Sequence, residues 1–348
     1  MSTPPKPPRA GGGPTSHDVA RLAGVSQTTV SRVLRQDPTV REPTRLRVMQ
    51  ALAQLRYQPN AAARAIRTRR SDSIGVVVGR LSNQIYPAML ETIGARLASL
   101  GQRMIVWDTE YGGDAQASQA LRQGSVDGVI LTTATRQSPF LGEVSSPHAP
   151  VVLVNRTIDG YPSDQVASDN MQGGRSVAEY FVHGGRRRIA MISGPQDAST
   201  IRDREAGFRA GLQAHGVALP PHYCVRPDAF SHTDGQNAAM RLLELASPPD
   251  AIFCANDVLA LGAMDGARAL GVRVPDALWI VGYDDIEQAS WGAYDLTTVR
   301  QPIDLMVARA IDLLLARIQD AERPLAQECF ANELVIRSST GRQPLPAA

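Results

Sequence analysis

The chain has 348 residues, of which 43% are hydrophobic and 20% are charged, and its formal net charge is +2 at pH 7. This length exceeds that of a usual single domain, so we expect two or three domains, each with its own core. The sequence has no run of about twenty apolar residues that could cross a membrane. Residues 1–15 are rich in Pro and Gly and lack the apolar stretch of a secretory signal, which predicts a disordered leader.

The basic residues are concentrated at the start of the chain. Residues 1–70 hold thirteen Lys and Arg but three acids, whereas residues 71–348 hold 23 basic and 31 acidic residues. A basic segment attracts phosphate groups irrespective of base sequence. The acidic remainder would not compete for them. This division predicts a nucleic-acid-binding head on an acidic body.

The segment Ser16–Arg35, SHDVARLAGVSQTTVSRVLR, predicts two short helices joined by a tight turn. We expect a first helix over His17–Ala23, with Ser16 or Asp18 near its N-cap. Gly24 lies where the turn needs a permissive backbone.

The second helix is expected from Gln27 to about Leu34, with Ser26 as its N-cap. Helical spacing turns Val30, Val33 and Leu34 inward. A third amphipathic helix over Thr44–Tyr57 would complete the core. Its inward residues are Val48, Leu52 and Leu55.

The outer face of the second helix would carry Gln27, Thr28, Ser31 and Arg32. These side chains suit DNA, because Arg pairs with guanine, Gln pairs with adenine and hydroxyl groups pair with either. Ordinary packing of helices produces the same geometry and is the alternative for this motif alone. The third helix and the basic charge favour the DNA-binding interpretation.

Residues 58–70 join the basic head to the body. Asn60 suits an N-cap and the alanines that follow favour a helix, but the segment has little apolar surface. It therefore predicts a helix that forms only when it is held in place. A plain solvated linker is the alternative.

From Ser73 the pattern alternates between apolar strands and amphipathic helices, which predicts doubly wound parallel sheets. About 270 residues of this pattern exceed one sheet of ordinary width, so we expect two similar lobes. The expected strands are 74–79, 103–107, 127–132, 151–155, 188–193, 251–255 and 279–283. The expected helices are 86–100, 114–123, 171–183, 204–215, 235–245, 257–270 and 302–318.

Polar residues gather where these strands end, which is where ligands bind in such sheets. They are Asn155, Thr200, Arg204, Asn256, Asp257, Asp284 and Asp285. Such side chains can bind a polyhydroxylated ligand or a carboxylate. The alternative for each is a cap or an ion pair: Asp257 could cap its helix, and Arg204 could pair with a surface acid. Arg300, beside Gln301, gives a faint indication of an anionic ligand.

Signals for catalysis, cofactors and metals are weak. No strand is followed by a Gly-rich nucleotide-binding sequence, and the six histidines have no metal-ligand spacing. Cys224, Cys254 and Cys329 are far apart and predict buried thiols in a reducing cytoplasm. We expect no catalytic residue, no cofactor and no metal, and an enzyme is the least favoured function.

Many separate motifs, in order, resemble the LacI/GalR family of bacterial transcription regulators over nearly the whole chain after the leader. They are DVARLAGVSQTTVSRVL (18–34), YQPNAAARAI (57–66), SDSIGVVV (71–78), SDN (168–170), GRRRIAMISGP (185–195), REAGF (204–208), ANDVLALGA (255–263), VGYDD (281–285) and LTTVRQP (296–302). The resemblance implies an N-terminal all-α helix-turn-helix head and an α/β two-lobed body like periplasmic binding proteins, built from two doubly wound parallel sheets. The implied domains are a leader 1–15, a DNA-binding domain 16–59, a hinge helix or linker 60–71, an effector-binding and dimerisation domain 72–341, and a tail 342–348. Lobe one would hold about 72–166 and 302–328, and lobe two about 167–301 and 329–341.

The resemblance also implies site residues. Those implied at DNA are Gln27, Thr28, Thr29, Ser31, Arg32, Asn60 and Ile66. Those implied at an effector in the cleft are Tyr86, Asn155, Thr200, Arg204, Phe230, Asn256, Asp284 and Gln301. Ile66 stands where the family usually has Leu, and Asn155 stands where many members have Asp.

The implied function is that of a repressor that binds a palindromic DNA operator as a homodimer and is released by a small sugar or sugar acid. A corepressor-dependent regulator, or a sugar-binding protein that does not bind DNA, is the alternative. No leucine heptad follows Arg342, so we expect a dimer without a tetramerising coiled coil. The expected location is the bacterial cytoplasm, at the nucleoid and not at a membrane.

Overall fold

A computed structural model describes residues 14–34, 37–57, 70–79, 81–144, 146 and 148–341. The chain divides into two compact units, Met1–Ser71 and Asp72–Ala348, which we call the head and the body. Within the described ranges, no helix is long and apolar enough to cross a membrane.

The head consists of three helices around one small core. They are α1 (Ser16–Ala23), α2 (Gln27–Leu34) and α3 (Glu42–Gln54). Val19, Val30 and Val48, one from each helix, are fully buried at the centre. The predicted turn forms as expected, with Gly24 in the left-handed region at φ 63°.

Three local expectations in the head are wrong. The N-cap of α1 is Thr15, and Asp18 completes a capping box with it. Leu34 is 38% exposed, because it is the last residue of α2 and lies at the edge of the head's core. The third helix begins at Glu42, where Pro43 fits the first turn, and ends at Gln54.

The first sheet of the body, sheet A, has the strand order β11-β5-β4-β3-β1-β2, and all its described pairings are parallel. Its strands are β1 (Ser73–Val78), β2 (Arg103–Asp108), β3 (Gly128–Leu131), β4 (Val151–Val154), β5 (Asp164–Ser168) and β11 (Gln327–Phe330). Its helices are α5 (Ile85–Ser99), α6 (Gly113–Arg122), α7 (Pro139–Glu143) and α12 (Ile303–Gln319), with the 3-10 turn η1 (Thr109–Tyr111).

The second sheet, sheet B, has the order β12-β10-β9-β8-β6-β7 and is parallel except for the β10–β12 pair. Its strands are β6 (Ile189–Ile192), β7 (Cys224–Val225), β8 (Ala251–Cys254), β9 (Trp279–Asp284), β10 (Thr297–Arg300) and β12 (Glu333–Val335). Its helices are α8 (Asn170–His183), α9 (Ser199–Ala214), α10 (His232–Leu243) and α11 (Asp257–Ala269). Short 3-10 turns are η2 (Pro221–Tyr223), η3 (Glu287–Ser290) and η4 (Ser338–Thr340).

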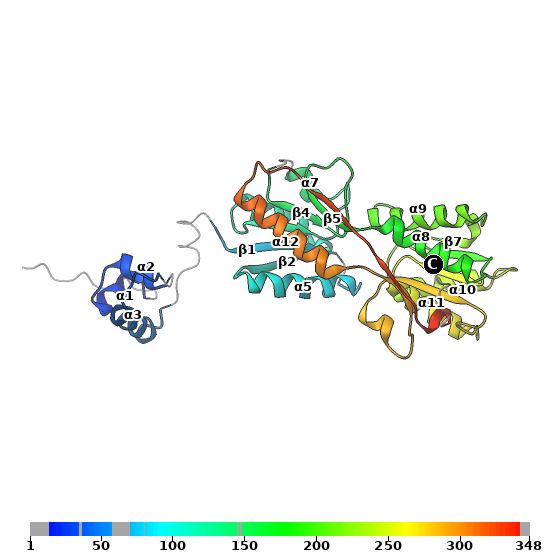
Figure 1. The fold of residues 1–348 in the computed structure, drawn as a ribbon, viewed down its shortest axis with the longest axis horizontal. Helices are drawn as coiled ribbons and strands as arrows, with labels where there is room; N and C mark the ends of the chain where they lie inside the picture. Colours follow the sequence, from blue (N-terminus) through cyan, green and yellow to red (C-terminus); the bar gives the residue numbers. More distant parts are fainter. Residues whose placement is uncertain are drawn as a thin grey trace, which may run out of the picture. The chain divides into compact units, whose positions relative to one another are not determined.

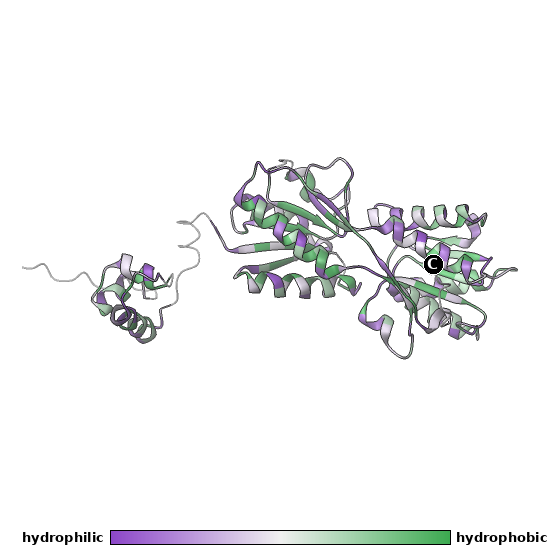
Figure 2. Cartoon of the chain, in the orientation of Figure 1, coloured by the Kyte–Doolittle hydropathy of each residue, from purple (hydrophilic) through white to green (hydrophobic). Residues whose placement is uncertain are grey.

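Helices cover both faces of each sheet, as the apolar strands require. In β1, Ile74 and Val76 pack with α5 and α12, whereas Val77 packs on the opposite face with α6 and α7. In sheet B, α8 and α9 cover one face, and α10 and α11 cover the other. The pairs appear side by side in Figure 1, and strands at the centre of the sheets are coloured mostly as hydrophobic in Figure 2.

The chain passes three times between sheet A, which forms lobe one, and sheet B, which forms lobe two. The three crossovers follow β5, β10 and β11. Strand β5, which leads into the first crossover, ends at Ser168, and strand β11, which leads into the third crossover, ends at Phe330. Both ends lie two residues beyond the lobe limits that the family resemblance implies, 166 and 328. The polar segments at the crossovers therefore lie together, which positions the site described below.

Every predicted strand and long helix is present, with ends shifted by one to a few residues. The largest shift is in α9, which begins at Ser199 rather than Arg204. The elements that the sequence pattern missed are α7, β5, β7, β10, β11, β12 and the 3-10 turns. These elements are short, and several are polar, as in DQVAS of β5, so they carry no clear period.

Candidate functional site

The outer face of α2 carries a compact set of polar side chains. Gln27, Thr28 and Arg32 are exposed, and Thr29 and Ser31 are half-buried. The predicted cap forms: the backbone N of Thr29 donates to the Oγ of Ser26 at 3.1 Å. These five side chains therefore lie on one helix of eight residues, and three of them are exposed to solvent.

Gln27 is also tied to the neighbouring helix. Its Nε2 donates to the Oγ of Ser16 at 2.8 Å, which fixes the side-chain amide at the start of α2. Asn60 and Ile66, the two other residues expected at DNA, lie outside the described residues.

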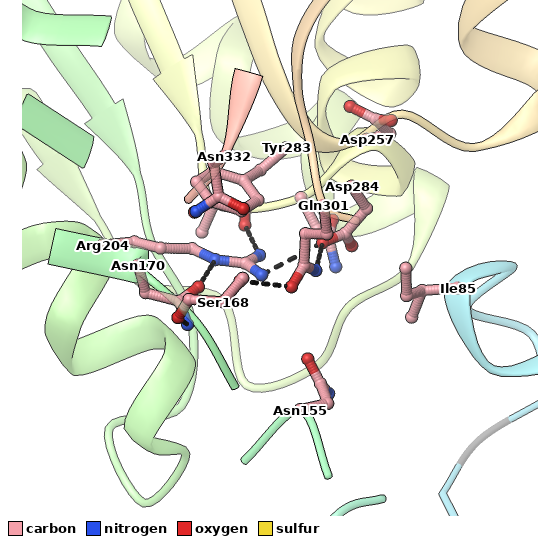
Figure 3. Close-up of polar contacts among 12 residues, drawn as sticks. Ile85, Asn155, Ser168, Asn170, Arg204, Asp257, Tyr283, Asp284, Gln301 and Asn332 are labelled. Atoms are coloured by element: carbon pink, nitrogen blue, oxygen red, sulfur yellow. Dashed lines mark hydrogen bonds and ion pairs between the residues drawn. The ribbon is translucent and has the colours of Figure 1, made fainter. Parts of the chain in front are cut away.

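In lobe two, Arg204 of α9 is the centre of a buried network. Its Nε donates to Asn170 Oδ1 at 2.8 Å, its Nη1 to the carbonyl oxygen of Ala255 at 2.6 Å, and its Nη2 to Asp284 Oδ1 at 3.0 Å. The guanidinium carbon also lies 3.6 Å from the centroid of the Tyr283 ring. Figure 3 shows Arg204 reaching between Asn170 and Asp284. Each of the three nitrogens has a hydrogen-bond acceptor, and the side chain is 4% exposed.

The same network reaches the crossovers. Gln301 Nε2 donates to Asp284 Oδ1 at 2.8 Å, and Ser168 Oγ donates to Gln301 Oε1 at 2.6 Å (Figure 3). Asn332 Nδ2 donates to the Tyr283 hydroxyl at 2.7 Å. Ser168, Gln301 and Asn332 each belong to a different crossover. Arg204 and Asp284 therefore belong to one contact network with residues of all three connections between the lobes.

Two carboxyl groups of lobe two are held in low-dielectric surroundings. Burial raises the pKa of Asp284, although Arg204 and the hydrogen bond from Gln301 act to lower it. Burial raises the pKa of Asp257 well above its usual range, and the nearby Asp284 raises it further. Asp257 accepts hydrogen bonds from Thr298 Oγ1 and the backbone N of Ile286 and has no cationic partner among the described residues.

Three polar residues at the strand ends adopt a left-handed backbone. Asn155 has φ 72°, Asp284 φ 112° and Asp285 φ 54°. Non-glycine residues avoid this region unless their surroundings hold them there, and such residues cluster at functional sites. Asn and Asp tolerate it better than other residues.

On the lobe-one side, the polar groups are incompletely paired. Asn155 follows β4 and is 5% exposed; its Nδ2 donates to the carbonyl oxygen of Thr132 at 3.3 Å, but its Oδ1 is buried without a hydrogen bond. In Figure 3 this oxygen points toward the side where Gln301 and Ser168 lie. The next residue, Arg156, has a buried Nε without a partner.

A cavity of about 370 Å³ lies at the carboxyl ends of the strands and is lined by residues of both lobes. Tyr86 and Phe230 are among its lining residues, together with Arg156. Gly194 makes room for Phe230, because a Cβ at this position would collide with the ring. The cavity therefore offers two rings and one guanidinium group to a ligand.

The structure does not bring the eight residues expected at an effector into one group. Arg204, Asp284 and Gln301 bind one another, while Tyr86 and Phe230 line the cavity. Asn155 is buried beside the cavity residue Arg156, and Thr200 is buried in the first turn of α9. Asn256 is the N-cap of α11 and accepts from the backbone N of Leu259 at 2.9 Å.

Three interpretations from the sequence are wrong. Of the three cysteines expected to be buried, Cys254 is buried, but Cys224 is half-buried and Cys329 is exposed, because β7 and β11 are edge strands. Asp257 does not cap α11, because its neighbour Asn256 takes that position. Arg204 does not pair with a surface acid, since its partner Asp284 is buried. Arg300 is directed to acids of its own lobe: its Nε lies 2.6 Å from Asp285 Oδ2, and its Nη1 lies 3.2 Å from Glu333 Oε2.

Sequence reasoning missed several residues of this region: Arg156, Ser168, Asn170, Tyr283 and Asn332. A signal was present for four of them: Ser168 and Asn170 belong to the motif SDN, Arg156 directly follows Asn155, and Tyr283 directly precedes Asp284. Asn332 follows a strand that had no recognisable pattern. In the part of the chain that the structure describes, no group of three His, Cys, Asp or Glu could hold a metal ion.

Comparisons with known proteins agree with this division of the chain. Residues 15–60 match the pattern of bacterial regulatory proteins of the lacI family, and residues 178–340 match that of a periplasmic binding protein-like domain. The chain is 33% identical over 332 residues to the HTH-type transcriptional regulator DegA of Bacillus subtilis (strain 168), covering 94% of this chain and 98% of that protein.

Two further proteins show the same similarity. The ribose operon repressor of Escherichia coli (strain K12) is 33% identical over 309 residues, covering 87% of this chain and 93% of that one. A lac repressor dimer, solved bound to operator and the anti-inducer ONPF, matches with a TM-score of 0.84 and 29% identity, covering 95% of this chain and 100% of that one. The resemblance and the fold predicted from the sequence are thus confirmed: this chain belongs to the lacI family of bacterial regulatory proteins.

Proposed function

We propose that this chain is a transcriptional regulator that binds a palindromic DNA operator as a homodimer and responds to a small polyhydroxylated effector held between the two lobes of its body. One observation carries the proposal. A single chain joins a helix-turn-helix head with an exposed polar α2 face to a body in which buried polar groups from the strand ends meet at all three lobe crossovers.

For the head, we propose that Gln27, Thr28 and Arg32 read base edges and that Thr29 and Ser31 lie near phosphates. Two heads would place one recognition helix each in successive major grooves. Asn60 and Ile66 would act in a hinge segment at the minor groove, where an apolar side chain can wedge a base step.

For the body, we propose that the effector contacts lobe two through Arg204, Asp284 and Gln301, and lobe one through Asn155 and Tyr86. Phe230 would pack on the ligand, with Thr200 and Asn256 at its edge. A ligand that bridges two lobes binds one lobe arrangement better than another. It shifts the DNA-binding equilibrium only by this difference in affinity.

The direction of the response follows from the relatives by analogy. Two of them are named as repressors, which favours repression that the effector relieves. An effector that relieves repression lowers the affinity for DNA, whereas a corepressor raises it. The sign of the change in DNA affinity therefore decides between an inducer and a corepressor.

We propose residues 16–59 as the DNA-binding domain, 60–71 as the hinge and 72–341 as the effector-binding and dimerisation domain. The edge strand β2 supports dimerisation through sheet A, because Ile105 and Val106 on it are 36% and 41% exposed. The chain would act in the bacterial cytoplasm, at the nucleoid, and would not be an enzyme.

The test compares Arg32→Ala with Arg47→Ala, using the DNA fragment that the wild-type protein selects from a random duplex pool. Both arginines are exposed, but Arg47 lies on α3. We expect Arg32→Ala to lose about 1–3 kcal/mol of discrimination at one base pair. Arg47→Ala should weaken binding to all sequences alike. Fluorescence anisotropy with single-base-pair variants of the fragment measures both effects.

An unchanged sequence preference in Arg32→Ala would contradict the assignment of α2 as the reading helix. Circular dichroism of both variants provides the control, since neither side chain belongs to the head's core.

A further inference from the structure

We propose that the cavity lined by Tyr86, Phe230 and Arg156 selects an uncharged polyhydroxylated effector over a sugar acid, and that Arg156 donates hydrogen bonds to the oxygen atoms of this effector. This inference rests on the proposed function, because it assigns the chemical class of the effector. It narrows the choice between a sugar and a sugar acid that the sequence leaves open.

The two arginines that suggest an anionic ligand are already neutralised. Arg204 pairs with Asp284 at 3.0 Å, and the two side chains are 4% and 3% exposed. Arg300 pairs with both Asp285 and Glu333. An anionic ligand would have to compete with these carboxylates, so neither arginine supplies a site for a free negative charge.

Arg156 is held in a different way. Its Nη1 donates to the carbonyl oxygen of Thr133 and its Nη2 to the hydroxyl of Tyr86, both at 3.3 Å, the long end of the hydrogen-bond range. Its Nε is buried without a partner. Among the described residues, no carboxylate forms an ion pair with it. Arg156 therefore retains donor capacity for oxygen atoms of a ligand.

The charges that surround the cavity oppose an anion. Three carboxylates of its lining, those of Asp114, Asp197 and Asp228, come from both lobes, and among the described lining residues Arg156 is the one cation. Burial raises the pKa of Asp114, as expected for a half-buried carboxyl group. A carboxylate that enters meets like charges from both lobes, and like-charge contacts suppress binding of the wrong partner.

The remaining lining suits hydroxyl groups on a ring. Thr133, Thr135 and Ser138 contribute hydroxyl groups, while Tyr86 and Phe230 contribute aromatic faces. Carboxylates accept hydrogen bonds from ligand hydroxyl groups, and Arg156 donates to ligand oxygens. A polyhydroxylated molecule without a carboxylate can donate hydrogen bonds to these carboxylates and accept hydrogen bonds from Arg156.

The sign of the electrostatic potential in the cavity can be measured before the effector is known. We choose Thr135→Cys as the reporter, because Thr135 lines the cavity and is half-buried. In the full chain, Cys224 and the exposed Cys329 are replaced by Ser, while Cys254 is fully buried and stays. The reporter is labelled with a cationic ammonium or an anionic sulfonate methanethiosulfonate, and peptide mass spectrometry follows the rates.

We expect the ratio of cationic to anionic labelling rates to exceed that of 2-mercaptoethanol, a neutral thiol, by about tenfold, because charged clefts focus the field. Adding Arg156→Met should raise the ratio further, and adding Asp228→Asn should lower it. A ratio equal to that of the free thiol, or an inverted one, would overturn the proposal. The outcome does not depend on DNA binding, so a failure of the proposed function would be seen separately in the operator assay.

A second measurement tests the ligand class directly with matched pairs: D-glucose and D-glucuronate, and D-galactose and D-galacturonate. Thermal stabilisation of the full chain reports binding. In any pair that stabilises the protein, the neutral sugar should act at a concentration about tenfold lower than its acid, which corresponds to one like-charge contact of about 1.4 kcal/mol. An acid that acts at an equal or lower concentration would overturn the selectivity. If neither pair stabilises the protein, the labelling ratio alone decides the proposal.

Discussion

The two lobes present opposite kinds of polar surface to the space between them. In lobe two, Arg204 donates to three oxygens at 2.6–3.0 Å, and its carboxylate partner Asp284 receives a second bond from Gln301. In lobe one, Asn155 and Arg156 each have a buried polar atom without a partner, and their hydrogen bonds measure 3.3 Å. The Arg204–Asp284 pair is therefore held by short, charge-assisted bonds, whereas Asn155 and Arg156 are held by long ones; Asn332 Oδ1, beside Tyr283, is a further buried atom without a partner.

The difference indicates how binding energy is distributed. A buried donor or acceptor without a partner costs about 1–3 kcal/mol, which a ligand that completes the bond restores. Lobe two would therefore act as a rigid platform that also holds the crossovers. Lobe one would supply the groups whose pairing depends on the ligand. A ligand that satisfies Asn155 and Arg156 while resting on lobe two favours one arrangement of the lobes, which is what a regulator needs.

The largest expected effect comes from comparing two separate variants, each with one arginine of the cleft region replaced by methionine: one in lobe two and one in lobe one. Arg204→Met leaves Asp284 buried without its cation, so the free energy of unfolding should fall by about 3–5 kcal/mol. Arg156→Met removes only long hydrogen bonds to neutral groups, so its effect should stay below about 1 kcal/mol. Urea denaturation of both variants measures the two values.

If the two substitutions lower the free energy of unfolding equally, the ion-paired Arg204 and the weakly bonded Arg156 do not differ in their contribution to stability, which contradicts the comparison. If Arg204→Met does not fold, Gln301→Ala gives a milder test, because it removes one bond to Asp284 and leaves the ion pair in place.

A smaller effect concerns the pH dependence of the free energy of unfolding, and it compares two buried carboxyl groups of lobe two, those of Asp284 and Asp257. Asp284 has a guanidinium partner and Asp257 has none among the described residues, and burial raises the pKa of Asp257 well above 3.8. A carboxyl group whose pKa is raised on folding contributes stability that is fully present below the unfolded pKa. That stability is lost as pH rises through the folded pKa, at about 1.4 kcal/mol per pH unit between the two values.

Asp257→Asn keeps an acceptor for the backbone N of Ile286 and can donate to Thr298, but it cannot ionise. We therefore expect the stability of the variant relative to wild type to increase between pH 4 and pH 8. Urea denaturation across this range measures it. A constant difference between the two proteins would show that Asp257 does not titrate in this range with a raised pKa.

Much of the fold was predictable because its signals are local. The buried strands of the parallel sheets are continuous apolar runs, such as SIGVVV and AIFC, and the helices between them have a clear period. Strands β5, β11 and β12 escaped prediction, because sheet-edge and crossover strands are short and carry polar residues. Their identity depends on the neighbour they pair with, which no local pattern encodes.

The site was predictable in part for the same reason. Residues directly after apolar strands, such as Asn155 and Asp284, could be placed at the sheet edge from the strand pattern alone. The pattern could not show that Arg204 would be held by Asp284, because 80 residues separate them. Nor could it show that Arg156 would lack a carboxylate partner, since pairing depends on the contacts that three crossovers create.

Sequence-specific DNA binding is the most direct test of the whole account. Selection of fragments by the full chain from a random duplex pool, at moderate salt and followed by sequencing, gives the answer. The account predicts an enriched palindrome of about 14–20 base pairs, since two heads read half-sites about one helical turn apart. A pool without any enriched motif, whether or not sugars and sugar acids are present, would contradict it.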